Sequence, residues 1–225
     1  MSRANAATAA ALAGAFAALA GLIAAGELTS IDQWAVDHVM PGAVFGGKPT
    51  FADAVIPLRG VRWHGAVHIL STLVTLPASF TPATLIVAAA CLRLRGRPAV
   101  ALAAAYVAGN VVEVLVKGTL TRPPLHAGTM HLAGFDASYP SGHTIRTVFV
   151  ATAIAWAWPR LAPWAATWAV ASVVLLVLGG QHVPSDVAGG LAIAAALVLT
   201  TSSWTRERST GRRPSPACPP SARAR

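Results

Sequence analysis

The chain has 225 residues, of which 55% are hydrophobic and only 11% are charged, and its mean hydropathy is +0.58. Soluble domains carry about 25% charged residues, so this composition excludes a disordered chain and favours the bilayer as the surrounding solvent. The net charge is +9, but Lys and Arg punctuate long apolar runs and form no patch interleaved with aromatic residues, which argues against a nucleic-acid partner.

We therefore expect an all-α integral membrane protein with one domain. The domain is a six-transmembrane-helix bundle over residues 1–204, and a basic, disordered cytoplasmic tail follows over residues 205–225. Cys91 and Cys218 have neither pairing nor CxxC spacing, so no disulfide framework and no zinc site are expected.

The first apolar stretch, residues 6–26, has no charged residue between Arg3 and Glu27. A helix crosses the bilayer with roughly 20 such residues. A cleaved signal peptide is the alternative, because a basic residue precedes an apolar run that ends in small residues. The run is longer than the usual signal core of about 7 to 15 residues, so we predict a retained helix.

Residues 27–62 are mixed in polarity and rich in Pro and Gly, which indicates an extramembrane loop with room for one interfacial helix. A second span is expected over residues 65–91, interrupted by Pro77 and Pro82, which neighbouring helices can tolerate in a membrane. An arginine cluster at positions 93, 95 and 97 separates it from a third span over residues 98–117.

A loop over residues 118–140, rich in Pro, Gly and His, precedes three further spans, expected over residues 141–158, 164–181 and 186–204. Lys and Arg in short loops mark the cytoplasmic side of a membrane protein. The arginines that carry this signal are Arg93, Arg95, Arg97, Arg160, Arg206, Arg208, Arg212, Arg213, Arg223 and Arg225. Both termini are then cytoplasmic.

Polar residues at membrane depth are costly, so they count as functional candidates. In the third span, Asn110, Glu113 and Lys117 recur at helical spacing and share one face, and Glu113 can pair with Lys117. Taken alone, Lys117 fits better as a snorkelling residue at a helix end. Arg122 follows in the loop.

The tetrapeptide Pro-Ser-Gly-His, residues 140–143, stands where the extracytoplasmic loop turns into the fourth span. A helix start exposes unpaired N–H groups that bind phosphate, and Gly142 lets a ligand approach the backbone. Ser141 could instead serve only as the helix cap. His143 lies in the first turn, where it could donate a proton to a leaving oxygen. Arg146 lies on the same face, and an arginine there needs an anion or a wet cavity.

His182 and Asp186 border the last span, and their spacing lets a carboxylate at a helix start orient an imidazole. The six-span topology brings seven polar side chains to the extracytoplasmic side: Lys117, Arg122, Ser141, His143, Arg146, His182 and Asp186. A cationic cradle, two histidines and an orienting carboxylate suit phosphoryl transfer, whose charge fixed donors must neutralise. No carboxylate cluster that would hold a metal is evident.

The order of these motifs resembles the type 2 phosphatidic acid phosphatase superfamily of integral membrane lipid phosphatases, over roughly residues 6–204. The pattern of that family is Lys, six residues, Arg-Pro; then Pro-Ser-Gly-His; then Ser-Arg, five residues, His, three residues, Asp. The chain keeps the second motif complete, and His182 and Asp186 are the latter half of the third.

The resemblance implies a metal-independent mechanism without a cofactor, in which His182 attacks phosphorus to form a phosphohistidine and Asp186 orients it. His143 would protonate the leaving group and then activate water. The phosphate oxygens would be held by Lys117, Arg122, Ser141 and the Gly142 amide.

Two positions depart from the family pattern. Only four residues separate Lys117 from Arg122, and Leu176 stands six residues before His182, where the family has a phosphate-binding arginine. We hypothesise that Arg146 replaces this arginine from the neighbouring helix and that Arg122 reaches in for the first motif. The reason is that Arg146 shares a helix face with the histidine of the second motif and has no other evident partner.

The sequence thus predicts a phosphatase that acts on a lipid phosphate, or on a polyprenyl diphosphate such as undecaprenyl diphosphate, at the extracytoplasmic face of a bacterial cell membrane. Two alternatives remain open. Transfer of the phosphoryl group to a second acceptor would make the protein a lipid phosphotransferase. The missing arginines would also suit a catalytically silent protein that only binds a lipid phosphate.

Overall fold

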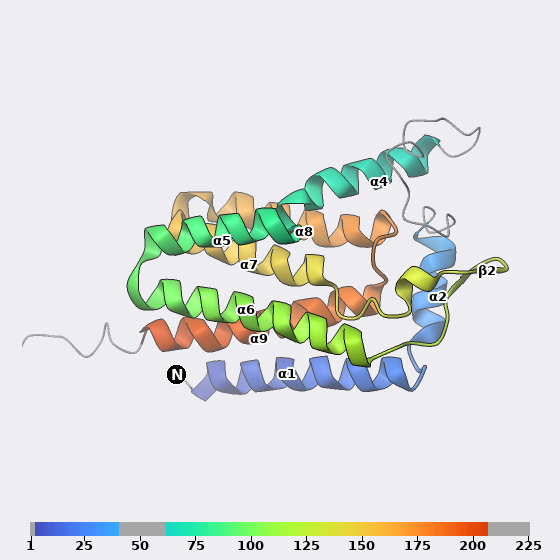
Figure 1. The fold of residues 1–225 in the computed structure, drawn as a ribbon, viewed down its shortest axis with the longest axis horizontal. Coiled ribbons are helices and arrows are strands. Elements are labelled where there is room, and N and C mark those ends of the chain that lie inside the picture. Colours follow the sequence, from blue (N-terminus) through green and yellow to red (C-terminus); the bar gives the residue numbers. More distant parts are fainter. Residues whose placement is uncertain (1–2, 41–61, 207–225) are drawn as a thin grey trace, which may run out of the picture.

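The computed structural model describes residues 3–40 and 62–206, which are mostly helical and form one elongated bundle (Figure 1). The α-helices are α1 (Arg3–Ala24), α2 (Thr29–His38), α4 (Arg62–Thr75), α5 (Phe80–Leu94), α6 (Gly96–Thr119), α7 (Gly142–Ala157), α8 (Ala162–Leu178) and α9 (Pro184–Arg206). Three short 3-10 turns are η2 (Leu76–Ala78), η3 (Ala133–Phe135) and η4 (Pro159–Leu161). Strands β1 (His126–Ala127) and β2 (Met130–His131) form a small antiparallel hairpin.

Helix α7 lies at the centre of the bundle and packs against α5, α6, α8 and α9 (Figure 1). Ile145 and Phe149 of α7 are fully buried, and the Phe149 ring meets Tyr106 of α6 edge-on with 5.9 Å between the ring centroids. A Cβ on Gly109 of α6 would lie 2.7 Å from the Phe149 ring. The glycine therefore allows α6 and α7 to approach closely.

Five helical segments in the described part of the chain are long and apolar enough to cross a membrane. They are Ala4–Ala24, Val67–Leu94, Gly96–Thr119, Pro159–Leu178 and Pro184–Ser202. Each overlaps a span expected from the sequence, and the second combines α4, η2 and α5 across the turn that contains Pro77.

The fourth expected span, residues 141–158, differs from the other five. It is a helix, α7, but has only 16 residues, which at 1.5 Å per residue is shorter than the roughly 30 Å of a hydrocarbon core. Its neighbours in the bundle bury most of its surface, so lipid contact does not dictate its length. The count of six membrane spans thus remains an expectation, with five candidate spans and α7 between them.

The first and last helices of the bundle, α1 and α9, lie side by side (Figure 1), and α9 is the one described helix with which α1 makes an extensive contact. Tyr139, in the loop before α7, joins this pair, because its hydroxyl donates a hydrogen bond of 2.8 Å to the carbonyl of Phe16. The two rings are stacked with 5.5 Å between their centroids. The helix expected at residues 6–26 is therefore packed into the fold.

The arginine cluster and the polar sequence motifs lie at opposite ends of the bundle, because α6 begins at the arginine cluster and ends near the motif residues Lys117 and Arg122. Arg93 donates a 2.7 Å hydrogen bond from Nε to the carbonyl of Ala157, where α7 ends, and its guanidinium covers the ring of Trp158. Most of the tail at residues 205–225 lies outside the described residues, since α9 ends at Arg206.

Helix α2 lies at the end of the bundle that carries the polar sequence motifs, and it is the helix expected within residues 27–62. Residues 41–61 lie outside the described part of the chain. The buried Ala35 and Val36 of α2 join a second apolar cluster that covers this end of the bundle. The other members come from the residues just after α2, from the 118–140 loop and from the turn before α9: Met40, Leu125, Leu132, Phe135 and Val183.

Candidate active site

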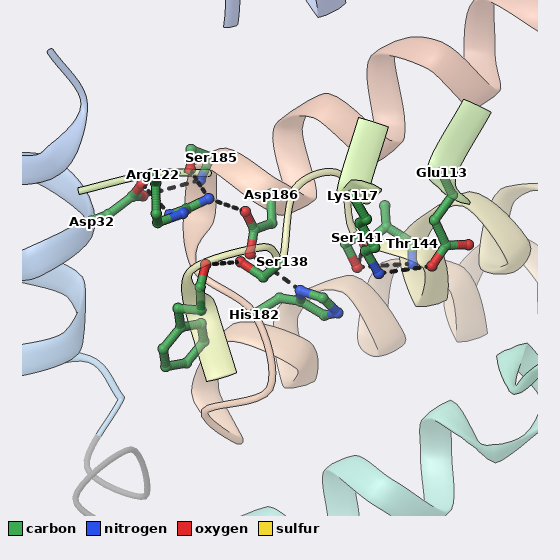
Figure 2. A network of polar contacts seen from close by, with 11 residues as sticks. Asp32, Glu113, Lys117, Arg122, Ser138, Ser141, Thr144, His182, Ser185 and Asp186 are labelled. Atoms are coloured by element: carbon green, nitrogen blue, oxygen red, sulfur yellow. Dashed lines mark hydrogen bonds and ion pairs between the residues drawn. The ribbon is translucent and has the colours of Figure 1, made fainter. Parts of the chain in front are cut away.

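The motif residues converge where α6 ends and where α7 and α9 begin (Figure 2). Helix α6 carries Glu113 and Lys117 near its C-terminus, and α7 begins directly after Ser141. His182 lies in the turn that leads into α9, and Asp186 lies in the first turn of that helix. Elements separated in sequence thus supply one cluster of polar side chains.

His182 and Asp186 are in contact, as their spacing predicts. His182 Nδ1 lies 3.2 Å from Asp186 Oδ2, and the Asp186 carboxylate is fully buried, while His182 is 9% exposed. When the carboxylate accepts a hydrogen from Nδ1, the tautomer is fixed and Nε2 carries the lone pair. This arrangement prepares Nε2 as a nucleophile or base.

His143 is the second histidine of the cluster. Its ring centroid lies 6.3 Å from that of His182, and the two ring planes are inclined at 54°. The first turn of α7 therefore brings one imidazole beside the other, although the two residues belong to different helix starts. The structure brings together both histidines and the carboxylate predicted to do the chemistry.

Ser141 is the N-cap of α7, which was the simpler of its two predicted roles. Its hydroxyl oxygen accepts hydrogen bonds from the backbone N–H of Thr144, at 3.2 Å, and from the Thr144 hydroxyl, at 3.0 Å. Its own backbone N–H donates to the carbonyl of Asp186 at 3.0 Å. Ser141 therefore ties the start of α7 to the start of α9, and its hydroxyl hydrogen remains a donor.

Glu113 lies between two cations of the cluster. Its Oε1 accepts a 2.8 Å hydrogen bond from Lys117 Nζ, and its Oε2 accepts one of 2.7 Å from Arg146 Nη1. The carboxylate also lies directly against Gly142, where any Cβ would overlap it. A negative group thus already occupies the space next to the N-terminus of α7.

Arg146 is 8% exposed and has several partners in addition to Glu113. Nε donates to the carbonyl of Ala78 at 2.9 Å, and Nη1 also donates to Asn110 Oδ1 at 3.0 Å. The premise that Arg146 has no other partner is therefore wrong. Helices far apart in sequence provide these partners, and the sequence alone does not show which faces of those helices meet.

Arg122 contacts the oxygen of Asp186 that does not face His182 (Figure 2). It lies at the centre of a buried ion-pair network. Its guanidinium pairs with Asp186 Oδ1 and, at 2.9 Å from Nη1, with Asp32 Oδ2. The backbone N–H of Arg122 donates to the carbonyl of Asp136 at 3.0 Å, which fixes the loop. In this arrangement the cation is directed at the orienting carboxylate.

Asp32 is the site residue that the sequence analysis missed. Burial is the main influence on its carboxyl group and raises its pKa, although the hydrogen bond from Ser185 and the charge of Arg122 act in the opposite direction. A signal was present, because Asp32 lies at helical spacing from Ala35 and Val36 on the buried face of α2. A carboxylate on an apolar helix face becomes buried when the helix packs, and it then requires a cation or hydrogen-bond donor as its partner.

In the described residues, no group of three or more His, Cys, Asp or Glu side chains is arranged to hold a metal ion. Leu176, where a phosphate-binding arginine was expected by resemblance, is fully buried at the end of α8. The carbonyl of Leu176 accepts hydrogen bonds from the backbone N–H groups of Gln181 and His182 at 3.0 and 3.2 Å. This position helps to shape the turn before α9.

Comparison with known proteins places this arrangement in a family. The model of the PAP2 superfamily matches residues 96–210, which is a little over half of the chain and includes α6, α7, α8 and α9. The chain belongs to the PAP2 superfamily. Its matched region contains every site residue except Asp32.

Among solved structures, the fold is similar to the crystal structure of a transmembrane PAP2 type phosphatidylglycerolphosphate phosphatase from Bacillus subtilis. The TM-score is 0.59, and the match covers 91% of this chain and 99% of the other, at 17% sequence identity. No curated protein gives a significant match. Because this match covers 91% of the chain, the similarity in fold extends beyond the residues that the family model matches.

Proposed function

We propose that this PAP2 protein is an integral membrane phosphatase that hydrolyses a lipid phosphate or a polyprenyl diphosphate through a phosphohistidine. The observation that carries the proposal is the contact between His182 Nδ1 and Asp186 Oδ2 beside the His143 ring. A nucleophile, the group that orients it and a proton donor are the parts that such a reaction requires.

In the first step, the Nε2 lone pair of His182 attacks phosphorus, and the bond from phosphorus to the lipid oxygen breaks. His143 gives its proton to that oxygen, so the lipid leaves as an alcohol, or as a monophosphate if the substrate is a diphosphate. The imidazole of His182 becomes positively charged as the N–P bond forms. The Asp186 carboxylate stabilises this charge across the Nδ1 hydrogen bond.

In the second step, His143 takes a proton from water while the water oxygen attacks the phosphoryl group. The N–P bond breaks, inorganic phosphate leaves and His182 returns to its neutral form. The residues proposed to hold the phosphate oxygens are Lys117, Arg146, Ser141 and the amide of Gly142. Lys117 and Arg146 share the charge of Glu113, so they provide a net charge of +1 to the substrate.

The test is phosphate release by the detergent-purified protein, in the presence of EDTA, from a polyprenyl diphosphate, phosphatidic acid and phosphatidylglycerol phosphate. We expect His182→Ala to lower kcat by roughly 10³-fold or more, because it removes the nucleophile. The matched control is His38→Ala, which removes an exposed histidine of α2 and should leave the rate unchanged.

Equal release by wild type and His182→Ala would contradict the histidine mechanism. Binding of a lipid phosphate without release from any member of the panel would favour the silent binding protein. Appearance of the phosphoryl group on an added alcohol, at the expense of free phosphate, would identify a phosphotransferase. The panel also ranks the head groups, and loss of release in EDTA would contradict metal independence.

A further inference from the structure

We propose that Asp32 is a positioning residue of the active site, which acts on His182 through Arg122 and Asp186. This inference rests on the proposed function. It adds a part of the chain outside the matched residues 96–210 to the catalytic machinery. Helix α2 then contributes to the reaction and does more than cover the end of the bundle.

The first connection runs through Arg122 (Figure 2). Asp32 Oδ2 accepts a 2.9 Å hydrogen bond from Arg122 Nη1, and Arg122 Nη2 pairs with Asp186 Oδ1. The other oxygen of Asp186 lies 3.2 Å from the imidazole of His182. Asp186 therefore divides its two oxygens between the guanidinium and the nucleophile, and Asp32 holds the guanidinium from behind.

The second connection runs through Ser185, the residue before Asp186. The hydroxyl of Ser185 donates a 2.6 Å hydrogen bond to Asp32 Oδ2, and its backbone N–H donates to Asp32 Oδ1 at 3.2 Å. Asp32 thus caps the first turn of α9 from a different helix. It fixes the backbone that carries Asp186 as well as the cation that Asp186 contacts.

The charges of the network give Asp32 an electrostatic role. Asp32 is 2% exposed, Asp186 is fully buried and Arg122 is 7% exposed, so water screens these charges weakly. Two carboxylates share one guanidinium, which leaves a net charge of −1 beside His182. Without Asp32, the pair of Arg122 and Asp186 would be neutral, and the positive charge that develops on His182 would be stabilised less.

A role restricted to anchoring α2 predicts different behaviour. Ala35 and Val36 already bury α2 in the apolar cluster at this end of the bundle. Loss of an anchor would lower the thermal stability and leave kcat of the folded protein intact. Loss of a positioning residue lowers kcat while KM stays the same, because Asp32 does not touch the substrate.

The experiment is a comparison of Asp32→Asn with Asp37→Asn in the full-length protein. Asp37 lies on the same helix, is exposed, and contacts Gln33 Nε2 at 2.9 Å, so it makes a matched control. We expect Asp32→Asn to lower kcat by about 10- to 100-fold, with KM changed less than about twofold, and Asp37→Asn to behave as wild type. Asp32→Glu, which keeps the charge, should restore part of kcat.

A wild-type kcat in Asp32→Asn would overturn the inference. If Asp32→Asn fails to fold, Ser185→Ala takes its place, because it removes no charge and takes away the 2.6 Å hydrogen bond to Asp32 together with a longer one, of 3.4 Å, from Arg122 Nη2. This variant should lose about two- to tenfold in kcat, because it removes a charge-assisted hydrogen bond to the Asp32 carboxylate while Arg122 still pairs with that carboxylate. An unchanged kcat there would also overturn the inference.

A second measurement does not depend on the phosphatase reaction. The modification of His182 by diethyl pyrocarbonate, followed by mass spectrometry, reports how well its imidazole is oriented and polarised as a nucleophile. Asp32→Asn should slow this modification severalfold relative to Asp37→Asn, and equal rates would overturn the inference. An inactive wild type with this difference intact would refute the proposed function and support the positioning role.

Discussion

Glu113 is the residue whose surroundings most affect how phosphate can bind. Its carboxylate contacts Lys117, Arg146 and the start of α7, which are the groups proposed to receive the phosphate oxygens. A bound phosphate therefore has to share these cations with a side chain of the protein. The affinity of the site for anions is lower than two free cations at a helix N-terminus would give.

Glu113→Gln should strengthen inhibition by inorganic phosphate by about 3- to 10-fold, because the net charge of the cluster rises from +1 to +2. The measurement is the inhibition constant of phosphate in the release assay. Glu27→Gln, the same chemical change at an exposed position outside the cluster, serves as the control. Unchanged or weaker inhibition by phosphate in Glu113→Gln would contradict this role.

At the same scale, the sequence predicts contacts within one helix turn better than contacts between helices. The pairs Glu113–Lys117 and His182–Asp186 are confirmed. Residues four apart within a helix, or across the turn that begins one, lie close together whichever way the helix packs. The pair of Arg122 with Asp32 spans 90 positions in sequence, and that of Arg146 with Glu113 spans 33. These depend on which helix faces meet, which no local spacing encodes.

Among the elements, the junction of α9 with the loop before α7 is tightly packed. A Cβ on Gly189 of α9 would overlap the ring of Tyr139. Tyr139 is fully buried, and α1 holds it through the Phe16 carbonyl and ring, so it has little room to retreat. Burial also raises the pKa of the Tyr139 hydroxyl, which therefore stays protonated and able to donate.

Gly189→Ala should lower the melting temperature in detergent by about 3 to 10 °C, because overpacking at a rigid contact costs roughly 1 to 3 kcal/mol. Thermal unfolding followed by tryptophan fluorescence checks this. Gly118→Ala is the control, since a Cβ at Gly118 of α6 meets nothing within 4 Å. A melting temperature equal to that of Gly118→Ala would show that the junction yields more easily than the contacts indicate.

The sequence predicts the long apolar helices well, and it also predicts the central one, because the helix expected over residues 141–158 is α7 (Gly142–Ala157). Hydropathy reports the face turned to lipid, so α1, α6, α8 and α9 are evident from composition. Helix α7 is buried by other helices, and its length follows from its N-cap at Ser141 and its end at Ala157. The hairpin of β1 and β2 was not expected, because two paired residues per strand leave no alternating pattern.

In the whole molecule, the arginine cluster between α5 and α6 and the polar cluster of the active site lie at opposite ends of one bundle. If the arginine-rich end is cytoplasmic, the active site faces the other side of the membrane. Each end has an exposed residue that can be labelled. Thr129 lies in the hairpin between α6 and α7, at the end with the polar cluster, and Arg160 lies in the turn between α7 and α8, at the arginine-rich end.

Thr129→Cys should react with a membrane-impermeant maleimide in intact cells, and Arg160→Cys should react only after the membrane is permeabilised. Each is introduced into a chain whose 2 native cysteines are replaced by alanine. The order of labelling checks the orientation independently of activity. The reverse order would place the site in the cytoplasm and contradict the proposed orientation.

The pairing of α1 with α9 has a consequence for how the chain is assembled in the membrane. Helix α1 is made first, yet its main packing partner among the described helices is the last to leave the ribosome. Until residue 184 and those after it have been inserted, α1 stays in lipid without that partner. Assembly therefore finishes with closure of the bundle around α7, and a chain that stops after α8 contains neither Asp186 nor a place for its first helix.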